Sequence, residues 1–233
     1  LPHLWLWAHF VRGQAYEELG RDGHPAHGSF LPPLGERNRM WAGGRVRFLE
    51  PLRVGTPAER QSEILKIQEK QGSTGALLFF TVQHDYVQEG RLCVSEEQDI
   101  VYRAPTPPKL EGSVEPPSAQ WSATIEPTTV MLFRYSAVTF NGHRIHYDLD
   151  YVTQQEGYPG LVVHGPLIAT HMLQACVDAH PQREVASFNY RGLRPLIAPQ
   201  AFTVAGTLQD DGTARLWAAQ DGTLAHQAEV TFK

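Results

Sequence analysis

The chain has 233 residues, enough to bury a large hydrophobic core, and its 42% hydrophobic and 19% charged residues are typical of an ordered globular protein. Its 20 Lys and Arg residues against 25 Asp and Glu residues give a formal net charge of -5, and no basic block is present that could neutralise a run of phosphates. These numbers exclude intrinsic disorder as the main state and argue against a nucleic-acid partner.

The cysteines and the N-terminal residues indicate the compartment. Cys93 and Cys176 stand far apart without a CxxC motif, which indicates neither a disulfide framework nor a zinc site and fits a reducing environment. The apolar stretch at 4–11 is shorter than the roughly 20 residues of a membrane-spanning helix and lacks the features of a signal peptide. We therefore expect no membrane partner and a cytoplasmic protein, or one of the mitochondrial matrix if the source is eukaryotic.

The sequence predicts an irregular N-terminal segment, here called the lead-in, followed by strands. Residues 1–44 are rich in aromatics, Gly and Pro and show no sustained period. Strands are predicted at 45–50, 75–87 and 91–102, with Glu89-Gly90 as a hairpin turn before the last of them. The segment 58–70 fits both a strand and a helix, and local propensity favours the helix.

A proline-rich segment divides the chain. Residues 104–120 hold five prolines, which cannot donate to a β-ladder or sit inside a helix. We therefore predict an N-terminal half at 1–103, a linker at 104–125 and a C-terminal half at 126–233 that carries the candidate site.

The C-terminal half contains two predicted helices. A strand or extended segment is expected at 133–141, and Asp148 is a good N-cap for a short helix at 149–156 that stops at Gly157. A longer helix opens at His164-Gly165-Pro166, where proline suits the first helical position, and ends at His180-Pro181.

Strands are then predicted near 185–194, 200–209, 213–220 and 223–232, with hairpin turns at Asp211-Gly212 and Asp221-Gly222. A long apolar helix followed by four antiparallel strands suggests an α+β fold in which a sheet wraps around a helix. The motif LEPL at 49–52 recurs as LRPL at 193–196, each time after an aromatic strand and before a long meander. This repetition raises the hypothesis that the two halves arose by duplication of one unit.

The densest polar cluster, at 139–148, contains Asn141, His143, Arg144 and His146. His146 is the candidate base, because an imidazole titrates near neutral pH and can take a proton from water and return it. Asn141 is a candidate for orienting that water. The alternative is that all four are loop and cap residues without a catalytic role.

The start of the long helix offers backbone donors. The amide of Gly165 has no intrahelical partner, so an enolate oxygen could bind there, although an ordinary helix start is the alternative. His164 is either a ligand-facing group or a cap, and His171 is expected to be a buried, hydrogen-bonded core residue. Arg191 and Arg194 could bind a carboxylate or phosphate, or be solvated. The absence of GxSxG, P-loop and GxGxxG motifs leaves serine hydrolase, nucleotide triphosphatase and Rossmann interpretations without support.

Two runs carry a family resemblance, FNGHRIHYDLDYV and GYPGLVVHGPLIATHML. They resemble the active-site segment of the MaoC-like, R-specific enoyl-CoA hydratases and dehydratases of the hot-dog fold. Further stretches resemble the double hot-dog branch that contains itaconyl-CoA and mesaconyl-C4-CoA hydratases and the 3-hydroxyacyl-thioester dehydratases of fatty-acid synthesis: DGHP, FLPPL, RMWAGGRVRF, EEQDIVYR, FRYSAVTFNGHRIHYD and YRGLRPL.

The resemblance implies a fold and an assembly. The fold is a double hot dog of the α+β class, with two antiparallel sheets that each wrap around a central helix and form a pseudo-dimer. The N-terminal half would be a degenerate hot dog, and 58–70 would be a strand. A monomer or a homodimer would fit this arrangement.

The resemblance also assigns residues. The family histidine falls on His146 and the oxyanion glycine on Gly165, but the family aspartate falls on Asn141. A neutral amide can orient a water and cannot take its proton, so His146 would do more of the acid–base work. Coenzyme A would enter as part of the substrate, and no metal or redox cofactor is expected. Candidate substrate-binding residues are His143, Arg144, His164, Arg191, Arg194, Trp41 and Arg45, and Arg191, Arg194 or Arg45 are the candidates for a substrate carboxylate.

The expected function is therefore that of a hydro-lyase, an acyl-CoA hydratase or dehydratase that acts on a short, dicarboxylic 2-enoyl-CoA such as itaconyl-CoA or mesaconyl-CoA. The alternatives are a 3-hydroxyacyl-thioester dehydratase of fatty-acid synthesis, a hot-dog thioesterase that uses the same helix-end oxyanion site, and a non-catalytic acyl-thioester binding module.

Overall fold

The computed structural model describes residues 1–26, 30–32, 35, 37–72 and 75–233. Pro33 and Leu34 of the FLPPL stretch lie outside the described residues. The strands of the N-terminal half are β1 (Asn38–Phe48), β2 (Ala58–Gly72), β3 (Gly75–Gln88) and β4 (Arg91–Arg103). Those of the C-terminal half are β5 (Trp121–Ile125), β6 (Val185–Gly192), β7 (Phe202–Leu208), β8 (Ala214–Gln220) and β9 (Thr223–Phe232). The helices are α1 (Thr129–Thr139), α2 (Leu149–Gln154) and α3 (Gly165–Ala179), with short 3-10 turns η1 (Trp5–Ala8), η2 (Tyr16–Glu18) and η3 (Arg144–His146).

All nine strands form one antiparallel sheet in the order β2-β3-β4-β1-β6-β9-β8-β7-β5. Read outward from the junction of β1 and β6, the two halves have the same order, because β4, β3 and β2 occupy the positions of β9, β8 and β7. A duplicated unit predicts this arrangement. The α+β class is as predicted, but the two sheets are joined edge to edge through β1 and β6 into one continuous sheet.

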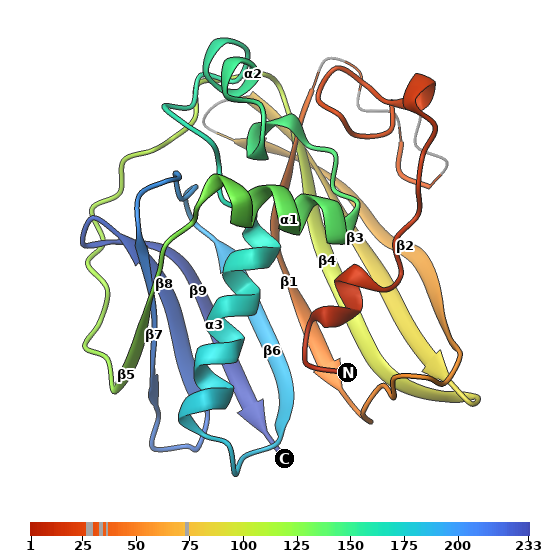
Figure 1. The fold of residues 1–233 in the computed structure, drawn as a ribbon, viewed down its shortest axis with the longest axis vertical. Coiled ribbons are helices and arrows are strands. Elements are labelled where there is room, and N and C mark those ends of the chain that lie inside the picture. Colours follow the sequence, from red (N-terminus) through yellow and green to blue (C-terminus); the bar gives the residue numbers. More distant parts are fainter. Residues whose placement is uncertain (27–29, 33–34, 36, 73–74) are drawn as a thin grey trace.

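In the part of the chain that the structure describes, only the C-terminal half of the sheet wraps around a full helix. Figure 1 shows α3 lying against strands β6 to β9, and its apolar face is buried in the main core through residues that include Ile168, Met172 and Cys176. In the N-terminal half, η1 takes the corresponding place among the described residues, and the flanking Leu4 and Leu6 are buried with Val46 of β1. The expectation of a central helix in each half is therefore corrected, because among the described residues the short turn η1 and the large apolar side chains around it cover this part of the sheet.

Several sequence predictions are confirmed. Segment 58–70 is strand β2, which pairs with β3 along its whole length. Its polar composition favours a helix locally, and the backbone pairing with β3 outweighs that preference. The two-residue turns at Glu89-Gly90 and Asp221-Gly222 have positive φ at both residues, as tight hairpins require.

Three boundaries differ from the predictions. Segment 133–141 was expected to be extended, and most of it belongs to α1, whose first turn is capped by the Thr128 hydroxyl accepting from the Met131 amide at 3.1 Å. β1 begins at Asn38, inside the expected lead-in. Within the expected linker, 121–125 is strand β5, which pairs with β7.

No helix among the described residues has the length and apolar character required to span a membrane.

Candidate active site

A cavity of about 510 Å³ lies where the N-terminal half of the sheet meets the helices and loops of the C-terminal half. It brings together six of the residues singled out from the sequence: Trp41, Asn141, His143, His146, Gly165 and Arg194. They come from β1, the segment 139–146, the start of α3 and the loop after β6. The cavity therefore depends on both halves of the chain.

His146 has one ring nitrogen fixed by the backbone. Its Nδ1 lies 2.7 Å from the carbonyl oxygen of Val162, which can only accept, so Nδ1 carries the hydrogen and Nε2 keeps a lone pair. The ring is 7% exposed and stacks on the ring of His164 with centroids 3.6 Å apart. This arrangement gives His146 the tautomer of a proton acceptor.

Burial lowers the pKa of His146 well below its usual value of 6.5, and the neighbouring His164 and His143 lower it further. The imidazole is therefore neutral at physiological pH. A neutral imidazole with a free Nε2 can remove a proton from water.

His164 is the N-cap residue of α3 and is completely buried. Its Nε2 lies 2.8 Å from the Ser136 hydroxyl on α1, and burial lowers its pKa to about 3. It is not among the residues that line the cavity. Its contact with the site is the stacking that holds the His146 ring.

Gly165 is the first residue of α3, and its amide has no acceptor among the described residues. The indole of Trp41 covers its Cα, since a Cβ built on Gly165 would lie 2.7 Å from Trp41 Cε3. Trp41 in turn stacks on Tyr190 with centroids 4.6 Å apart. The wall beside the free amide is thus formed by packed aromatic rings.

Asn141 follows the end of α1, where Phe140 has φ 53°. Its side-chain oxygen accepts from the backbone amide of His143 at 3.1 Å, and the backbone amide of Asn141 donates to the Ser136 carbonyl at 2.9 Å. The carboxamide therefore forms a tight turn that positions His143, besides lining the cavity.

Arg144 holds together the segments that surround the cavity. Its guanidinium donates to Asp148, with the shorter contact at 2.7 Å, and to the Arg21 carbonyl at 3.0 Å, and it stacks over Tyr151. Asp148 in turn caps α2 through the Tyr151 amide, as predicted. Arg144 thereby ties the N-terminal segment to α2 and is not among the cavity residues.

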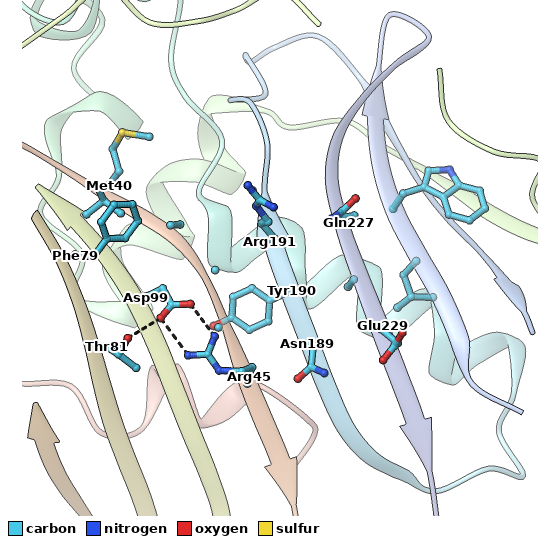
Figure 2. A pocket seen from close by; sticks show the side chains of 18 of the residues that line it. Met40, Arg45, Phe79, Thr81, Asp99, Asn189, Tyr190, Arg191, Gln227 and Glu229 are labelled. Carbon is cyan, nitrogen blue, oxygen red and sulfur yellow. Dashed lines mark hydrogen bonds and ion pairs between the residues drawn. The ribbon is translucent and has the colours of Figure 1, made fainter. Parts of the chain in front are cut away.

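Arg45 and Arg191 lie on the other face of the sheet. Val46 and Tyr190 are buried in the core, so their strand neighbours Arg45 and Arg191 point away from α3. Arg45 and Arg191 line a separate groove of about 1080 Å³, where Arg45 binds Asp99 at 2.8 Å (Figure 2). The structure does not bring these two arginines to His146.

Arg194 does line the cavity, but its guanidinium donates to three backbone carbonyls, those of Leu224, Gln220 and Thr223. Its side-chain donors are therefore largely used in holding the loop after β6 against the turn between β8 and β9. His171 is only half-buried, and its Nε2 has no hydrogen-bond partner, so the expectation of a hydrogen-bonded core histidine is wrong.

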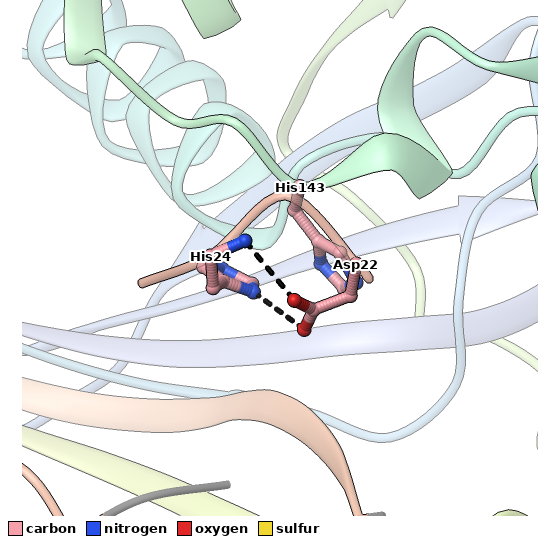
Figure 3. A group of neighbouring side chains, drawn as sticks. All are labelled: Asp22, His24 and His143. Atoms are coloured by element: carbon pink, nitrogen blue, oxygen red, sulfur yellow. Dashed lines mark hydrogen bonds and ion pairs between the residues drawn. The ribbon is translucent and has the colours of Figure 1, made fainter. Parts of the chain in front are cut away.

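Sequence reasoning missed a polar group contributed by the N-terminal segment. Asp22 is 4% exposed and accepts from the backbone amide and Nδ1 of His24, both at 3.0 Å (Figure 3). The His24 ring lies 4.4 Å from the His143 ring, and both line the cavity. The Asp-Gly-His motif that supplies them was noted only as part of the family resemblance.

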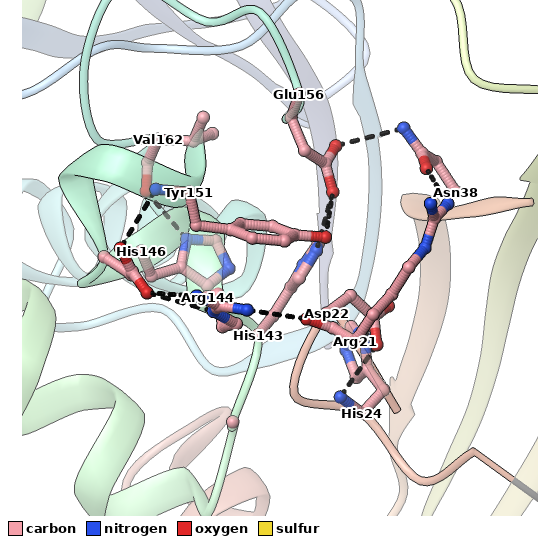
Figure 4. A network of polar contacts seen from close by, with 12 residues as sticks. Arg21, Asp22, His24, Asn38, His143, Arg144, His146, Tyr151, Glu156 and Val162 are labelled. Carbon is pink, nitrogen blue, oxygen red and sulfur yellow. Dashed lines mark hydrogen bonds and ion pairs between the residues drawn. The ribbon is translucent and has the colours of Figure 1, made fainter. Parts of the chain in front are cut away.

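Glu156 extends this network. It lines the cavity, accepts from Asn38 at 3.1 Å and from the Tyr151 hydroxyl at 3.3 Å, and lies 3.7 Å from His143 Nε2 (Figure 4). Among the described residues, Asp22, His24 and His143 also form a group whose possible ligand atoms lie within 4.8 Å of one another. The expectation that no metal is required stays a prediction.

The buried histidines predict a loss of stability in acid. Burial lowers the pKa of His24, His84 and His226 to about 4 and that of His164 to about 3. In the unfolded chain each returns to about 6.5, so the unfolded state binds more protons below that pH. Stability should be complete above about pH 6.5 and fall steadily as the pH drops toward about 4. Thermal unfolding midpoints across this range test the expectation, and a midpoint independent of pH would contradict it.

Comparison with known proteins places this chain in a family. The family model described as hydroxyacyl-thioester dehydratase type 2 matches residues 4–198. The chain is 42% identical over 233 residues to mesaconyl-C(4)-CoA hydratase of Chloroflexus aurantiacus, covering 99% of this chain and 83% of that protein. It is 31% identical over 214 residues to the mitochondrial hydroxyacyl-thioester dehydratase type 2 of Schizosaccharomyces pombe, covering 80% and 71%.

A solved MaoC-like dehydratase from Phytophthora capsici has a similar fold, with a TM-score of 0.67 at 15% identity over 88% of this chain and 76% of that one. This likeness confirms the predicted hot-dog fold of the MaoC-like proteins. The family match and the 42% identity confirm that the protein is an enzyme of the hydratase and dehydratase type. The chain therefore belongs to the hydroxyacyl-thioester dehydratase type 2 family of MaoC-like hydro-lyases.

Proposed function

We propose that the enzyme adds water to the double bond of a short 2-enoyl-CoA that carries a second carboxylate, of the mesaconyl-CoA or itaconyl-CoA type. The observation that carries the proposal is that a neutral imidazole with a free Nε2, on His146, and an unpaired amide, on Gly165, line one cavity. The name of the 42% identical relative, a mesaconyl-C(4)-CoA hydratase, supports this substrate class.

The two groups match the two demands of the reaction. A thioester makes Cβ of the enoyl group electrophilic, because the carbonyl oxygen accepts the displaced electron pair as an enolate. His146 removes a proton from water as the oxygen bonds to Cβ, and the Gly165 amide donates to the enolate oxygen. His146 then returns the proton to Cα. No electrons are gained or lost overall, so no redox cofactor is needed. We propose that the Gly165 amide stabilises the enolate oxygen and that no metal is required for this step.

Arg39 is the candidate for binding the second carboxylate. It lines the cavity on β1, and its guanidinium forms no ion pair or hydrogen bond among the described residues, although the Asp22 carboxylate is close enough to act on its pKa. Burial lowers its pKa. A guanidinium whose N–H groups are not engaged in an ion pair can bind a carboxylate through two parallel hydrogen bonds. The wall also carries Arg60, Arg103 and Lys109, whose charges suit the phosphates of coenzyme A.

Replacing Arg39 by Met should separate carboxylated from uncarboxylated substrates. Loss of a charge-assisted hydrogen bond costs about 1.5–3 kcal/mol, so kcat/KM for mesaconyl-CoA should fall by roughly 10- to 100-fold. The value for crotonyl-CoA, which has no second carboxylate, should stay the same. Arg47→Met is the matched control, since Arg47 lies on the same strand with an exposed side chain that contacts Ser95. An equal loss with both substrates would contradict the proposed role of Arg39.

The function itself is tested by following enoyl absorbance and free thiol together. Hydration removes the absorbance without releasing thiol, whereas a thioesterase releases thiol. A panel of enoyl-CoA substrates with and without a second carboxylate should show the largest kcat/KM for a carboxylated one. Thiol release, or binding without any product, would overturn the proposal.

The remaining assignments are also proposals. The joined half-sheets provide within one chain the pairing of two hot-dog units, so a monomer suffices for the site, although a homodimer fits as well. Both cysteines are free and buried, which supports a reducing compartment such as the cytoplasm or, in a eukaryote, the mitochondrial matrix.

A further inference from the structure

Two Asx-Gly-His turns face each other at the cavity. In one turn the Asp22 side chain accepts from the His24 amide at 3.0 Å, and in the other the Asn141 side chain accepts from the His143 amide at 3.1 Å. The first turn comes from the N-terminal segment and the second from the loop after α1. Both have the same local hydrogen bond and both present an imidazole to the cavity.

The turns are packed through their glycines. A Cβ on Gly23 would lie 1.9 Å from the Gly142 carbonyl oxygen, and a Cβ on Gly142 would lie 2.4 Å from the Gly23 oxygen. The Arg144 amide also donates to the Asp22 carbonyl at 2.9 Å. Only glycine permits this approach, so the position of His24 is fixed by a close backbone contact with the catalytic loop.

The chemical difference between the turns is the carboxylate. Asn141 stands where the resemblance to MaoC-like enzymes expects an aspartate, and the facing turn carries Asp22 at the equivalent position. The second carboxylate oxygen of Asp22 lies 3.0 Å from His24 Nδ1. Because a carboxylate can only accept, it keeps the hydrogen on Nδ1 and leaves His24 Nε2 as an acceptor.

We propose that His24, held by Asp22, is the second acceptor for the reacting water and orients it in place of Asn141, whose side-chain oxygen already accepts from the His143 amide. The proposal rests on the proposed hydration of an enoyl-CoA. A water molecule has two hydrogens, and an attack on Cβ requires its oxygen to be aimed. His146 takes one hydrogen as a proton, while His24 accepts a hydrogen bond from the other, which stays on the oxygen as the hydroxyl hydrogen of the product. The proton taken by His146 goes to Cα, so all atoms of the water are accounted for.

The surroundings keep His24 in the accepting form. Burial lowers its pKa to about 4, and the nearby His143 and Arg39 act in the same direction, against the opposing effect of Asp22. His146 is a further titratable group near His24, since His24 helps to lower its pKa. The His24 ring therefore stays neutral at physiological pH and would lose its acceptor only in acid.

The test compares His24→Ala, Asp22→Asn and the wild type with an enoyl-CoA that the wild type hydrates. Both variants should lower kcat by about 10²-fold, the loss expected when a reacting group is misplaced, with KM little changed. In Asp22→Asn the new amide donates to Nδ1 and moves the ring hydrogen to Nε2, and the ¹⁵N shifts of His24 should report this tautomer change. Added imidazole should restore part of the kcat of His24→Ala, which a purely structural role would not allow.

Asp211→Asn is the matched control, because Asp211 forms the same kind of turn with the Thr213 amide at 2.9 Å on an exposed hairpin. Its kcat should equal that of the wild type. If His24→Ala and Asp22→Asn are as active as the wild type, the role of His24 is overturned and the hydratase proposal stands. If the wild type hydrates no enoyl-CoA of the substrate panel, the proposed function is overturned. A change confined to KM in these variants would also overturn the proposed role of His24. Loss of activity on chelation, restored by zinc, would assign Asp22, His24 and His143 to a metal instead.

Discussion

His146→Ala is expected to lower kcat by roughly 10²- to 10⁴-fold, the range for a lost general base. The imidazole is the group whose Nε2 is left free by the hydrogen bond from Nδ1 to the Val162 carbonyl, and the stacked His164 holds its plane. Because the loss concerns the proton transfer, kcat should change far more than KM. Initial rates of the loss of enoyl absorbance at saturating substrate give kcat.

His146→Gln keeps more of the side-chain volume and tests whether the loss comes from unfolding. His171→Ala is the control for removing an imidazole, since His171 lies on α3 outside the cavity and its Nε2 has no partner. The control should retain the wild-type kcat, and all three variants should keep the circular dichroism of the folded protein. A folded His146 variant with unchanged turnover would falsify the mechanism.

Gly165→Ala is expected to lower kcat by about 10²- to 10³-fold, as the loss of one oxyanion donor does. The substitution keeps the amide, but its Cβ would lie 2.7 Å from Trp41 Cε3, so the indole or the start of α3 must move. Either movement misaligns the donor with the enolate oxygen or narrows the acyl site. Helix propensity favours alanine over glycine, so the helix itself should not be weakened by the change.

The double variant Gly165→Ala with Trp41→Leu separates the clash from other effects. The smaller leucine makes room for the new Cβ, so the double variant should be more active than the product of the two single effects predicts. Simple additivity of the two losses would show that the contact between Trp41 and residue 165 does not control the donor.

Local signals predicted much of the fold correctly. The Asp148 cap, Pro166 at the start of α3 and the acid-glycine turns all act within a few residues, so their outcome can be seen in the sequence. Segment 133–141 misled because its aromatic and β-branched residues favour an extended chain. The Thr128 cap and the burial of Leu132 and Ser136 against the C-terminal half made it a helix instead.

The candidate site could be predicted only in part, because sequence patterns report local contacts and miss those made by distant parts of the chain. His146, Asn141 and Gly165 lie in two neighbouring segments with a recognisable pattern, and the structure brings them to one cavity. The arginines could not be chosen by type or spacing. Alternate side chains of a strand point to opposite faces of the sheet, and the pairing of the strand decides which face Arg45 occupies. Whether the Arg194 guanidinium can bind a ligand depends on its hydrogen bonds to carbonyls 26 to 30 residues away.

The sequence by itself determined the α+β class, the strand meanders, the start of α3 and the histidine and glycine of the site, because each depends on short-range backbone preferences or a contiguous motif. Only the tertiary structure decided that β1 joins β6 and that Asp22 and His24 face a loop about 120 residues away. Contacts at that separation are set by the pairing register of the sheet and by the close approach of Gly23 and Gly142. Neither leaves a local periodicity for a sequence pattern to reveal.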